Sequence, residues 1–261
     1  MSETESQEEV PVKRRRRGIY LLPNVFTTAA LFAGFYAIVA SMKSHFEPAA
    51  IAIFIAMILD GIDGRVARLT NTQSDFGAEY DSLSDMISFG LAPALVMYQW
   101  TLSGMGKPGW LAAFIFTAAA ALRLARFNTQ VGIADKRYFQ GLPSPSAAAI
   151  VTGFVWVGDS YALYNGSYSI VALVLTIVIG LLMVSNVRYY SFKGIDWKGK
   201  VPFVVPLVFV LLIVLVSYDP PLVLFAGFLI YALSGPVFTL VQLRRRRAER
   251  KAQRAQDSAS E

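Results

Sequence analysis

The chain of 261 residues has no cysteine and a single histidine, His45. Without cysteine there can be no disulfide framework and no thiolate metal site. One histidine excludes any reaction that needs two histidines, and with no cysteine it also excludes a His-Cys zinc site. A bound metal must therefore be held by oxygen ligands, which leaves Mg²⁺, Mn²⁺ or Ca²⁺ as candidates.

Charge is scarce too, because 16% of the residues are charged while 55% are hydrophobic. A soluble globular domain usually has about a quarter of its residues charged. A membrane-spanning helix needs about 20 mostly apolar residues; five stretches meet or nearly meet that length, and a sixth is marginal. Two shorter apolar runs, 48–59 and 108–122, are counted as spans whose ends carry charge, which gives eight. The predicted helices cover residues 21–42, 48–70, 78–101, 108–127, 145–163, 168–187, 202–217 and 221–243. The sequence therefore predicts an all-α integral membrane protein with eight transmembrane helices.

The basic residues give an orientation for these helices. If the N-terminus is cytoplasmic, 22 of the 24 Lys and Arg residues fall on the inner side, and only Lys43 and Lys107 fall outside. Such a bias is typical of cytoplasmic segments and predicts that both termini are cytoplasmic. The arginine runs at 14–17 and 244–247 are expected to contact anionic lipid headgroups. No aromatic or groove-reading pattern accompanies them, so we expect no nucleic-acid partner.

Acidic residues concentrate between residues 60 and 85, which hold six of the eighteen. Charged side chains near hydrocarbon usually line a cavity and have a function. Asp60 and Asp63 lie three residues apart on one predicted helix, and Asp81 and Asp85 lie four apart on the next, so each pair shares a helix face. The link between the helices is only about eight residues, 69–76. We therefore expect an antiparallel hairpin that points four aspartates at one another.

Four carboxylates at close range repel one another unless cations or protons neutralise them. Two divalent cations with oxygen ligands, Mg²⁺ or Mn²⁺, would do so. A pair of such ions also stabilises the attacking and leaving oxygens of a phosphoryl transfer. Neighbouring glycines would let a bulky phosphate ligand approach the backbone, and Arg68 offers a forked donor for a pyrophosphate oxygen. The pattern thus predicts metal-assisted phosphoryl chemistry.

This hairpin resembles the signature of the CDP-alcohol phosphatidyltransferase family at every fixed position. The fixed positions are Asp60, Asp63, Gly64, Ala67, Arg68, Gly77, Asp81 and Asp85. The resemblance implies a six-helix catalytic core that transfers a phosphatidyl group from CDP-diacylglycerol to an alcohol and releases CMP. It also implies two divalent metals held by the four aspartates, and a homodimer. The residues it implies for CDP-diacylglycerol binding are Asp60, Gly64, Ala67, Arg68 and Gly77.

Other segments are similar to the phosphatidylserine synthase branch of that family, which implies L-serine as the acceptor. These segments are residues 22–24, 34–36, 88–93, 123–128 and 138–145. Eight spans instead of six also suit that branch. The expected organisation is a tail at 1–17, a catalytic core at 18–190, two additional transmembrane helices at 191–243 and a basic cytoplasmic tail at 244–261.

Serine carries a carboxylate and an ammonium beside its hydroxyl, so a serine site needs a guanidinium and oxygen ligands for the amine. Arg123 and Arg126 end the predicted fourth helix on the side of the aspartates, and Asn128 and the Ser144 hydroxyl lie near them in the sequence. We expect these four residues to bind serine; the alternative is that the arginines are only positive-inside anchors. Ser144 is also expected to be a helix N-cap with Pro145 as the first helical residue.

In the expected mechanism Asp85 both ligates metal and acts as general base for the acceptor hydroxyl. Direct displacement is favoured, and a covalent intermediate on an aspartate is the competing route. Other acceptors, glycerol 3-phosphate or inositol phosphate, would need a further cationic pocket, which Lys136 and Arg137 could provide. These two residues could equally be solvated loop charges.

A function of a different class, an ion-coupled transporter, would place acids across the depth of the membrane. Here the acids cluster at one face, with Asp159 and Asp219 isolated on the other. The sequence thus favours an enzyme, with its active site on the cytoplasmic side of a cell inner membrane, and a bacterial source.

Overall fold

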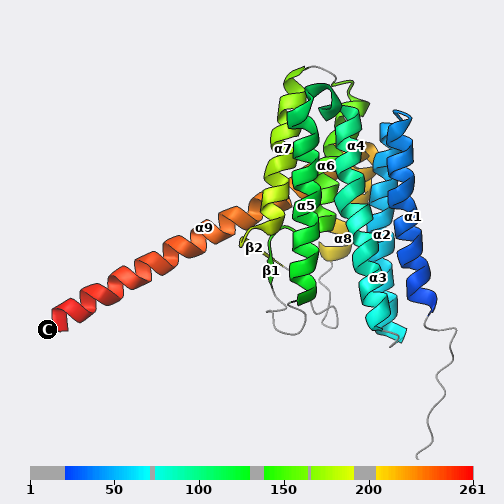
Figure 1. The fold of residues 1–261 in the computed structure, drawn as a ribbon. Coiled ribbons are helices and arrows are strands. Elements are labelled where there is room, and N and C mark those ends of the chain that lie inside the picture. Colours follow the sequence, from blue (N-terminus) through cyan, green and yellow to red (C-terminus); the bar gives the residue numbers. More distant parts are fainter. Residues whose placement is uncertain (1–20, 71–73, 130–137, 164–165, 191–203, 261) are drawn as a thin grey trace, which may run out of the picture.

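The computed structural model describes residues 21–70, 74–129, 138–163, 166–190 and 204–260. Figure 1 shows a bundle of helices from which the last helix extends away. The α-helices of the described residues are α1 (Leu21–Met42), α2 (Phe46–Thr70), α3 (Asp75–Asp85), α4 (Ala92–Trp100), α5 (Lys107–Thr129), α6 (Ser144–Ser160), α7 (Gly166–Val184), α8 (Val204–Tyr218) and α9 (Pro220–Ser260). Every stretch predicted to be helical coincides with one or more of these helices.

The predicted helix at 78–101 is interrupted by a π-helix. Its parts are α3, the π-helical turn η2 (Met86–Leu91) and α4. The Ala92 N–H donates to the Ile87 carbonyl, five residues back instead of four. Pro93 follows directly and has no N–H to continue an α-helical ladder, which gives a physical reason for the wider turn. Single π-turns inside helices are frequent at functional sites, and this one begins immediately after Asp85.

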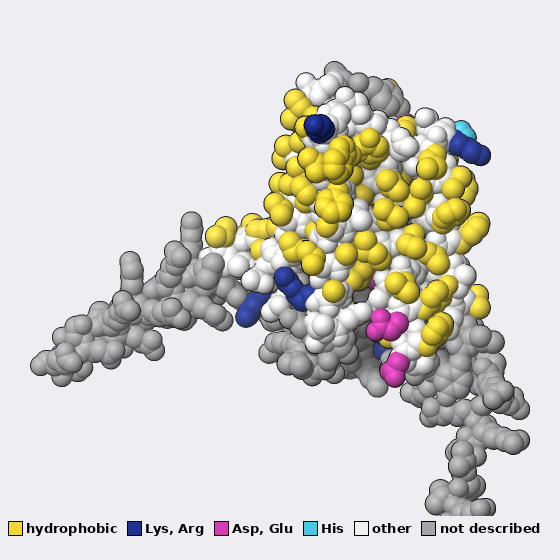
Figure 2. All heavy atoms as spheres, viewed as in Figure 1, with side chains coloured by type: hydrophobic (Ala, Val, Ile, Leu, Met, Phe, Trp, Pro, Cys, Tyr) yellow, Lys and Arg dark blue, Asp and Glu magenta, His cyan; other side chains and the backbone are white. Residues whose placement is uncertain are grey.

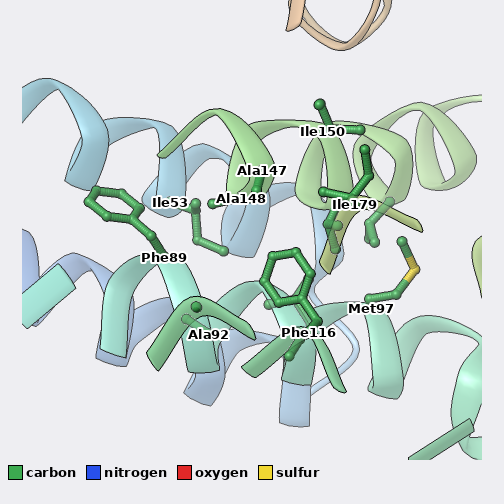
Figure 3. Close-up of a cluster of buried hydrophobic side chains, with 14 of the residues drawn as sticks. Ile53, Phe89, Ala92, Met97, Phe116, Ala147, Ala148, Ile150 and Ile179 are labelled. Atoms are coloured by element: carbon green, nitrogen blue, oxygen red, sulfur yellow. The ribbon is translucent and has the colours of Figure 1, made fainter. Parts of the chain in front are cut away.

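The core is centred on α6, of whose 17 residues twelve are buried. Helices α2, α4, α7 and α9 pack against it. Figure 3 shows side chains from the surrounding helices meeting the small residues of α6. The labelled side chains are Ile53, Phe89, Ala92, Met97, Phe116, Ala147, Ala148, Ile150 and Ile179. Small residues let helix backbones approach closely, as is usual in membrane bundles.

The outside of the bundle is apolar. Figure 2 shows hydrophobic side chains over the middle of the visible face and acidic side chains toward its lower end. Leu211 on α8, for example, is 65% exposed. Exposed apolar area of this extent indicates contact with membrane lipid. Among the described residues, four helical stretches are long and apolar enough to cross a membrane: Asn24–Met42, Lys107–Thr129, Gly166–Val184 and Pro220–Leu240. The class of all-α membrane protein is thus supported, while the eight spans and the cytoplasmic termini stay predictions.

A small antiparallel sheet was not predicted. Strand β1 (Tyr138–Gln140) pairs with β2 (Arg188–Tyr190), with Phe139 opposite Tyr189. The sheet lies at the end of the bundle where α5 ends and α3 begins (Figure 1). Three-residue strands are too short to show a period of two in the sequence. Their aromatic residues, which favour strands, were the available signal.

The last helix is longer than expected. Helix α9 was predicted to end at residue 243 and to be followed by a polar tail, but its backbone stays helical to Ser260. Residues 244–260 are rich in Arg and Ala and contain neither glycine nor proline. These residue types have high helix propensity, which is the physical reason for the continuation. The expected tail at 1–17 lies outside the described residues.

Candidate active site

Helices α2 and α3 bring three of the predicted aspartates together. Asp60, Asp63 and Asp81 each offer a carboxylate oxygen, and these oxygens all lie within 4.8 Å of one another. Asp63 is buried, and the other two are half-buried. The aspartate spacing seen in the sequence therefore brings these three carboxylates together at one end of the bundle.

Asp85 lies one helical turn beyond Asp81, next to this cluster. It interacts electrostatically with Asp60 and Asp81, and the Asp60 side chain is within hydrogen-bonding reach of both. Asp85 is not one of the three residues whose oxygens meet within 4.8 Å. The four predicted aspartates thus gather, with Asp85 next to the group of three.

The donor set of this cluster fits a metal ion. All of its ligand atoms are carboxylate oxygens, the type that hard divalent cations prefer. One of them, Asp81 Oδ1, is buried and has no hydrogen-bond partner among the described residues. A buried carboxylate oxygen without a donor is costly unless a cation compensates for it. The aspartate cluster could therefore hold a metal.

Helix α1 supports the cluster through a residue that sequence reasoning missed. Thr27 Oγ1 donates to Asp63 Oδ2 at 2.7 Å. The helix that carries Asp81 and Asp85 is in turn bound to α1, because Ser84 Oγ donates to the Thr27 carbonyl at 3.1 Å. The next serine on that face, Ser88, donates to the Ala30 carbonyl at 3.1 Å. The four-residue spacing of these serines signalled a polar helix face but not its partner.

The glycine and arginine positions of the signature lie at the same end. Gly64 and Arg68 are one turn apart on α2, and a Cβ at Gly64 would lie 3.8 Å from Arg68 Nη1. Ala67 is half-buried, and Arg68 is exposed. The Gly77 N–H donates at 3.1 Å to Ser74 Oγ, the N-cap of α3. Binding of CDP-diacylglycerol by these residues stays a prediction.

Arg123 on α5 points toward the aspartates. It interacts electrostatically with Asp85, and its Nη1 donates to Ser144 Oγ at 2.5 Å. Its Nε is buried and has no hydrogen-bond partner among the residues the structure describes. The expectation that Ser144 is an N-cap was wrong, because Pro143 holds that position and Ser144 begins α6. The Ser144 hydroxyl is engaged by Arg123 instead of by the backbone of its own helix.

Arg126 and Asn128 occupy the end of α5. Arg126 Nη1 is buried and, within the described part of the chain, has no hydrogen-bond partner. Asn128 is exposed, and its Nδ2 donates to Ser82 Oγ on α3 at 3.0 Å. The bond connects α5 to the helix of the aspartates. Two further candidates, Lys136 and Arg137, lie outside the described residues.

Strand β2 carries a tyrosine next to this region. Tyr189 is fully buried, and burial, together with the neighbouring Tyr231, raises the pKa of its phenol to about 12. The phenol therefore stays protonated at physiological pH and donates to the Ala232 carbonyl of α9 at 3.0 Å. The bond joins β2 to the last helix.

The arrangement is a group of crowded carboxylates at one end of a membrane bundle, with Arg123 interacting with Asp85 and Arg126 one turn further along α5. Each arginine has a buried donor atom without a hydrogen-bond partner in the described part of the chain. A model of the CDP-alcohol phosphatidyltransferase family matches residues 20–181. The chain belongs to this family. The matched range contains all four aspartates together with Arg123, Arg126 and Ser144, so the phosphatidyltransferase domain includes the whole predicted site. Strand β2 and helices α8 and α9 follow that range.

Relatives from three domains of life resemble the chain. A Helicobacter pylori protein named CDP-diacylglycerol--serine O-phosphatidyltransferase is 37% identical over 225 residues, which cover 86% of this chain and 94% of the relative. A Methanocaldococcus jannaschii protein of the same name is 42% identical over 142 residues, or 54% of this chain and 63% of the relative. A Saccharomyces cerevisiae protein, also so named, is 38% identical over 139 residues, covering 48% of this chain and 50% of the relative.

Proposed function

We propose that this phosphatidyltransferase moves the phosphatidyl group of CDP-diacylglycerol to the hydroxyl of L-serine and yields phosphatidylserine and CMP. The observation that carries the proposal is the cluster of Asp60, Asp63 and Asp81 with Asp85 beside it, at one end of an apolar bundle. The names of the relatives support serine as the acceptor. Arg123 interacts with Asp85, and Arg123 and Arg126 each have a buried donor atom with no partner among the described residues, which fits a substrate that carries a carboxylate.

The four aspartates would hold two divalent cations, Mg²⁺ or Mn²⁺, which when bound neutralise charge on the attacking and leaving oxygens. Asp85 accepts the proton of the serine hydroxyl as its oxygen forms a bond to the β-phosphorus, which bears diacylglycerol. The bond from that phosphorus to CMP breaks, and Arg68 donates to the departing phosphate. Direct displacement inverts the configuration at phosphorus, whereas a covalent aspartyl intermediate would retain it.

Residues at the end of α5 and the start of α6 would bind the serine substrate. Arg126 Nη1, which has no hydrogen-bond partner among the residues the structure describes, would donate to the substrate carboxylate, and Arg123 adds a guanidinium beside Asp85. Ser144 fixes one side of Arg123, and Asn128 holds the end of α5 against Ser82. The four side chains would thus line the serine site with polar groups that face the aspartates.

The membrane arrangement that accompanies this function has eight spans, a six-helix core at 18–190 and two additional helices. The excess of basic residues on one side supports cytoplasmic termini and an active site facing the cytoplasm of a bacterial inner membrane. The family resemblance supports a homodimer. Because the chain lacks cysteine, single cysteines introduced at residues 103 and 257 would report sidedness with an impermeant maleimide; we expect labelling from opposite sides.

The decisive test is an acceptor screen with purified enzyme, CDP-diacylglycerol and Mn²⁺ or Mg²⁺, in which CMP release is measured. We expect release with L-serine and little with glycerol 3-phosphate or inositol phosphate. Release with either phosphate-bearing acceptor and none with serine would replace the proposed acceptor while leaving the family membership intact.

A further inference from the structure

Two segments that resemble the phosphatidylserine synthase branch, 34–36 and 88–93, lie against each other. Gly34 of α1 faces Ser88 of η2, and a Cβ at Gly34 would lie 2.6 Å from Ser88 Oγ and 2.8 Å from Ser88 Cα. Both distances are shorter than a Cβ atom tolerates, and the second is to backbone, which cannot rotate away. Glycine at this position therefore lets α1 and η2 approach each other closely.

Hydrogen bonds join the same two parts of the chain. Ser88 is fully buried, and its Oγ donates to the Ala30 carbonyl of α1 at 3.1 Å. One turn earlier, the buried Ser84 Oγ donates to the Thr27 carbonyl of α1, also at 3.1 Å. These two serines stand on either side of Asp85 in the sequence. The segment that carries Asp85 is therefore fixed to α1 at both ends.

The π-helical turn is also confined by α5. A Cβ at Gly90 would lie 3.1 Å from the Cβ of Ala120, which is fully buried. Phe89, between Ser88 and Gly90, lies in the buried cluster shown in Figure 3. The turn is thus packed against α1, α5 and the core.

The helix that follows from this turn toward the acid cluster needs such support. Asp81 meets Asp60 and Asp63 with one oxygen from each within 4.8 Å of the others. Helix α3 nevertheless packs chiefly against α1 and not against α2, which carries the other two aspartates. Carboxylates at this distance repel one another when no cation is bound. Packing on α1 must therefore hold Asp81 in place.

The π-turn decides the direction in which α3 presents its side chains. It closes with one residue more than an α-helical turn, as the bond from the Ala92 N–H to the Ile87 carbonyl shows. With α4 held in the core, replacing it by an α-helical turn would rotate α3 by about 100°, the advance of one residue around a helix axis. Asp81 would then turn away from Asp60 and Asp63.

We infer that Ser88 is a positioning residue for the aspartate cluster: bonded to α1 and packed against Gly34, it holds the π-helical turn in place, and this turn orients Asp81 toward the carboxylates of α2. The inference rests on the proposed function, because it takes a divalent cation as the ligand that this orientation serves. It gives the segments 34–36 and 88–93 a common role in metal binding, at a distance from the substrate.

The test measures Mn²⁺ binding to the full-length enzyme without substrates, from the electron paramagnetic resonance signal of the free ion. Ser88→Ala removes the hydrogen bond to the Ala30 carbonyl and keeps the Cβ. Gly34→Ala places a Cβ against Ser88 and forces η2 away from α1. We expect Mn²⁺ affinity to fall about tenfold in Ser88→Ala and further in Gly34→Ala, as is usual for residues that orient metal ligands.

Matched controls make the same two changes at the opposite end of the bundle. Ser169→Ala on α7 removes a hydroxyl that is hydrogen-bonded to Thr101 Oγ1 at 2.7 Å. Gly158→Ala on α6 places a Cβ against the Trp100 ring. Both controls should lower Tm, because they lose a hydrogen bond or crowd the core. Their Mn²⁺ affinity should stay at the wild-type value.

Two results would overturn the inference while leaving the proposed function intact. One is wild-type Mn²⁺ affinity in Ser88→Ala. The other is an equal loss of affinity in Ser169→Ala or Gly158→Ala, which would mean that any weakening of the fold has this effect. A wild-type enzyme that binds neither Mn²⁺ nor Mg²⁺ would instead overturn the metal part of the proposed function, and this inference with it.

Discussion

The two ends of the bundle both carry acidic side chains but use them differently. At one end Asp60, Asp63 and Asp81 face one another within 4.8 Å. At the other end Asp219 stands between α8 and α9, and both of its oxygens have donors. Tyr161 Oη donates to Asp219 Oδ2, and the Leu222 N–H donates to Asp219 Oδ1 at 3.2 Å.

The difference shows that neighbours, not residue type, decide what an aspartate does. Asp219 caps α9 and joins the start of that helix to the end of α6, so its hydrogen-bonding capacity is used within the fold. Asp81 has a buried oxygen with no described partner, and the nearest charged groups are other carboxylates. A substrate or cation can be recognised only by groups with such remaining capacity. Substitutions at the two ends should therefore have unequal effects.

The largest effect is expected from Asp85→Asn, with Asp219→Asn as the control at the opposite end. The amide cannot accept the proton of the acceptor hydroxyl, and we expect turnover to fall at least about 10³-fold while CDP-diacylglycerol still binds. Asp219→Asn should keep nearly all activity. CMP release and equilibrium binding of CDP-diacylglycerol check both. Near-normal turnover in Asp85→Asn would remove this residue from the mechanism.

A smaller effect is expected from Arg126→Lys, which keeps the charge but loses the planar fork. If Arg126 binds the serine carboxylate, kcat/KM for serine should fall about tenfold to a hundredfold, mainly through KM. KM for CDP-diacylglycerol should hardly change. Arg65→Lys on the exposed surface of α2 serves as the control. Equal kinetics in both variants would mean that Arg126 is only a membrane anchor.

Thr27→Val tests the support of the acid cluster from α1. Loss of the 2.7 Å hydrogen bond to Asp63 should loosen that carboxylate and raise the Mn²⁺ concentration for half-maximal activity about tenfold. Activity should recover at saturating Mn²⁺. The control is Thr176→Val, since the Thr176 hydroxyl donates to the Ala172 carbonyl of its own helix, α7. Identical metal titrations for the two variants would contradict the role given to Thr27.

The smallest effect is expected from Tyr161→Phe at the far end. The variant loses the hydrogen bond to Asp219, but the site is distant and Tyr161 is 52% exposed. Turnover should change by less than about twofold, and Tm should fall slightly. Thermal unfolding in detergent and CMP release measure the two. A large loss of activity would show that the two ends of the bundle are coupled, and that Asp219 does more than hold the fold together.

Much of the acid cluster was predictable from the sequence because its geometry is largely local. The spacing of Asp60 with Asp63 and of Asp81 with Asp85 places each pair on one helix face in any α-helix. The short link between the helices then leaves the antiparallel hairpin as the arrangement. The same local rule located the helical stretches, because apolar length depends only on the order of residues.

The supports of the site were not predictable in this way. Thr27 precedes Asp63 by 36 residues and Ser84 by 57, so no local spacing relates them. The N-cap prediction for Ser144 was wrong for a related reason. A local rule assigned its hydroxyl to the backbone, whereas a residue from another helix takes it.

The sequence by itself determined the helical membrane class, the family and the acidic residues that meet at one end, because helix periodicity and apolar length are properties of short segments. Only the tertiary structure decided which hydroxyl holds Asp63, which helix β2 binds, and that Asp219 is used as a cap. Those outcomes depend on helices packing side by side, and the small residues that allow close packing do not specify which distant partner will be met.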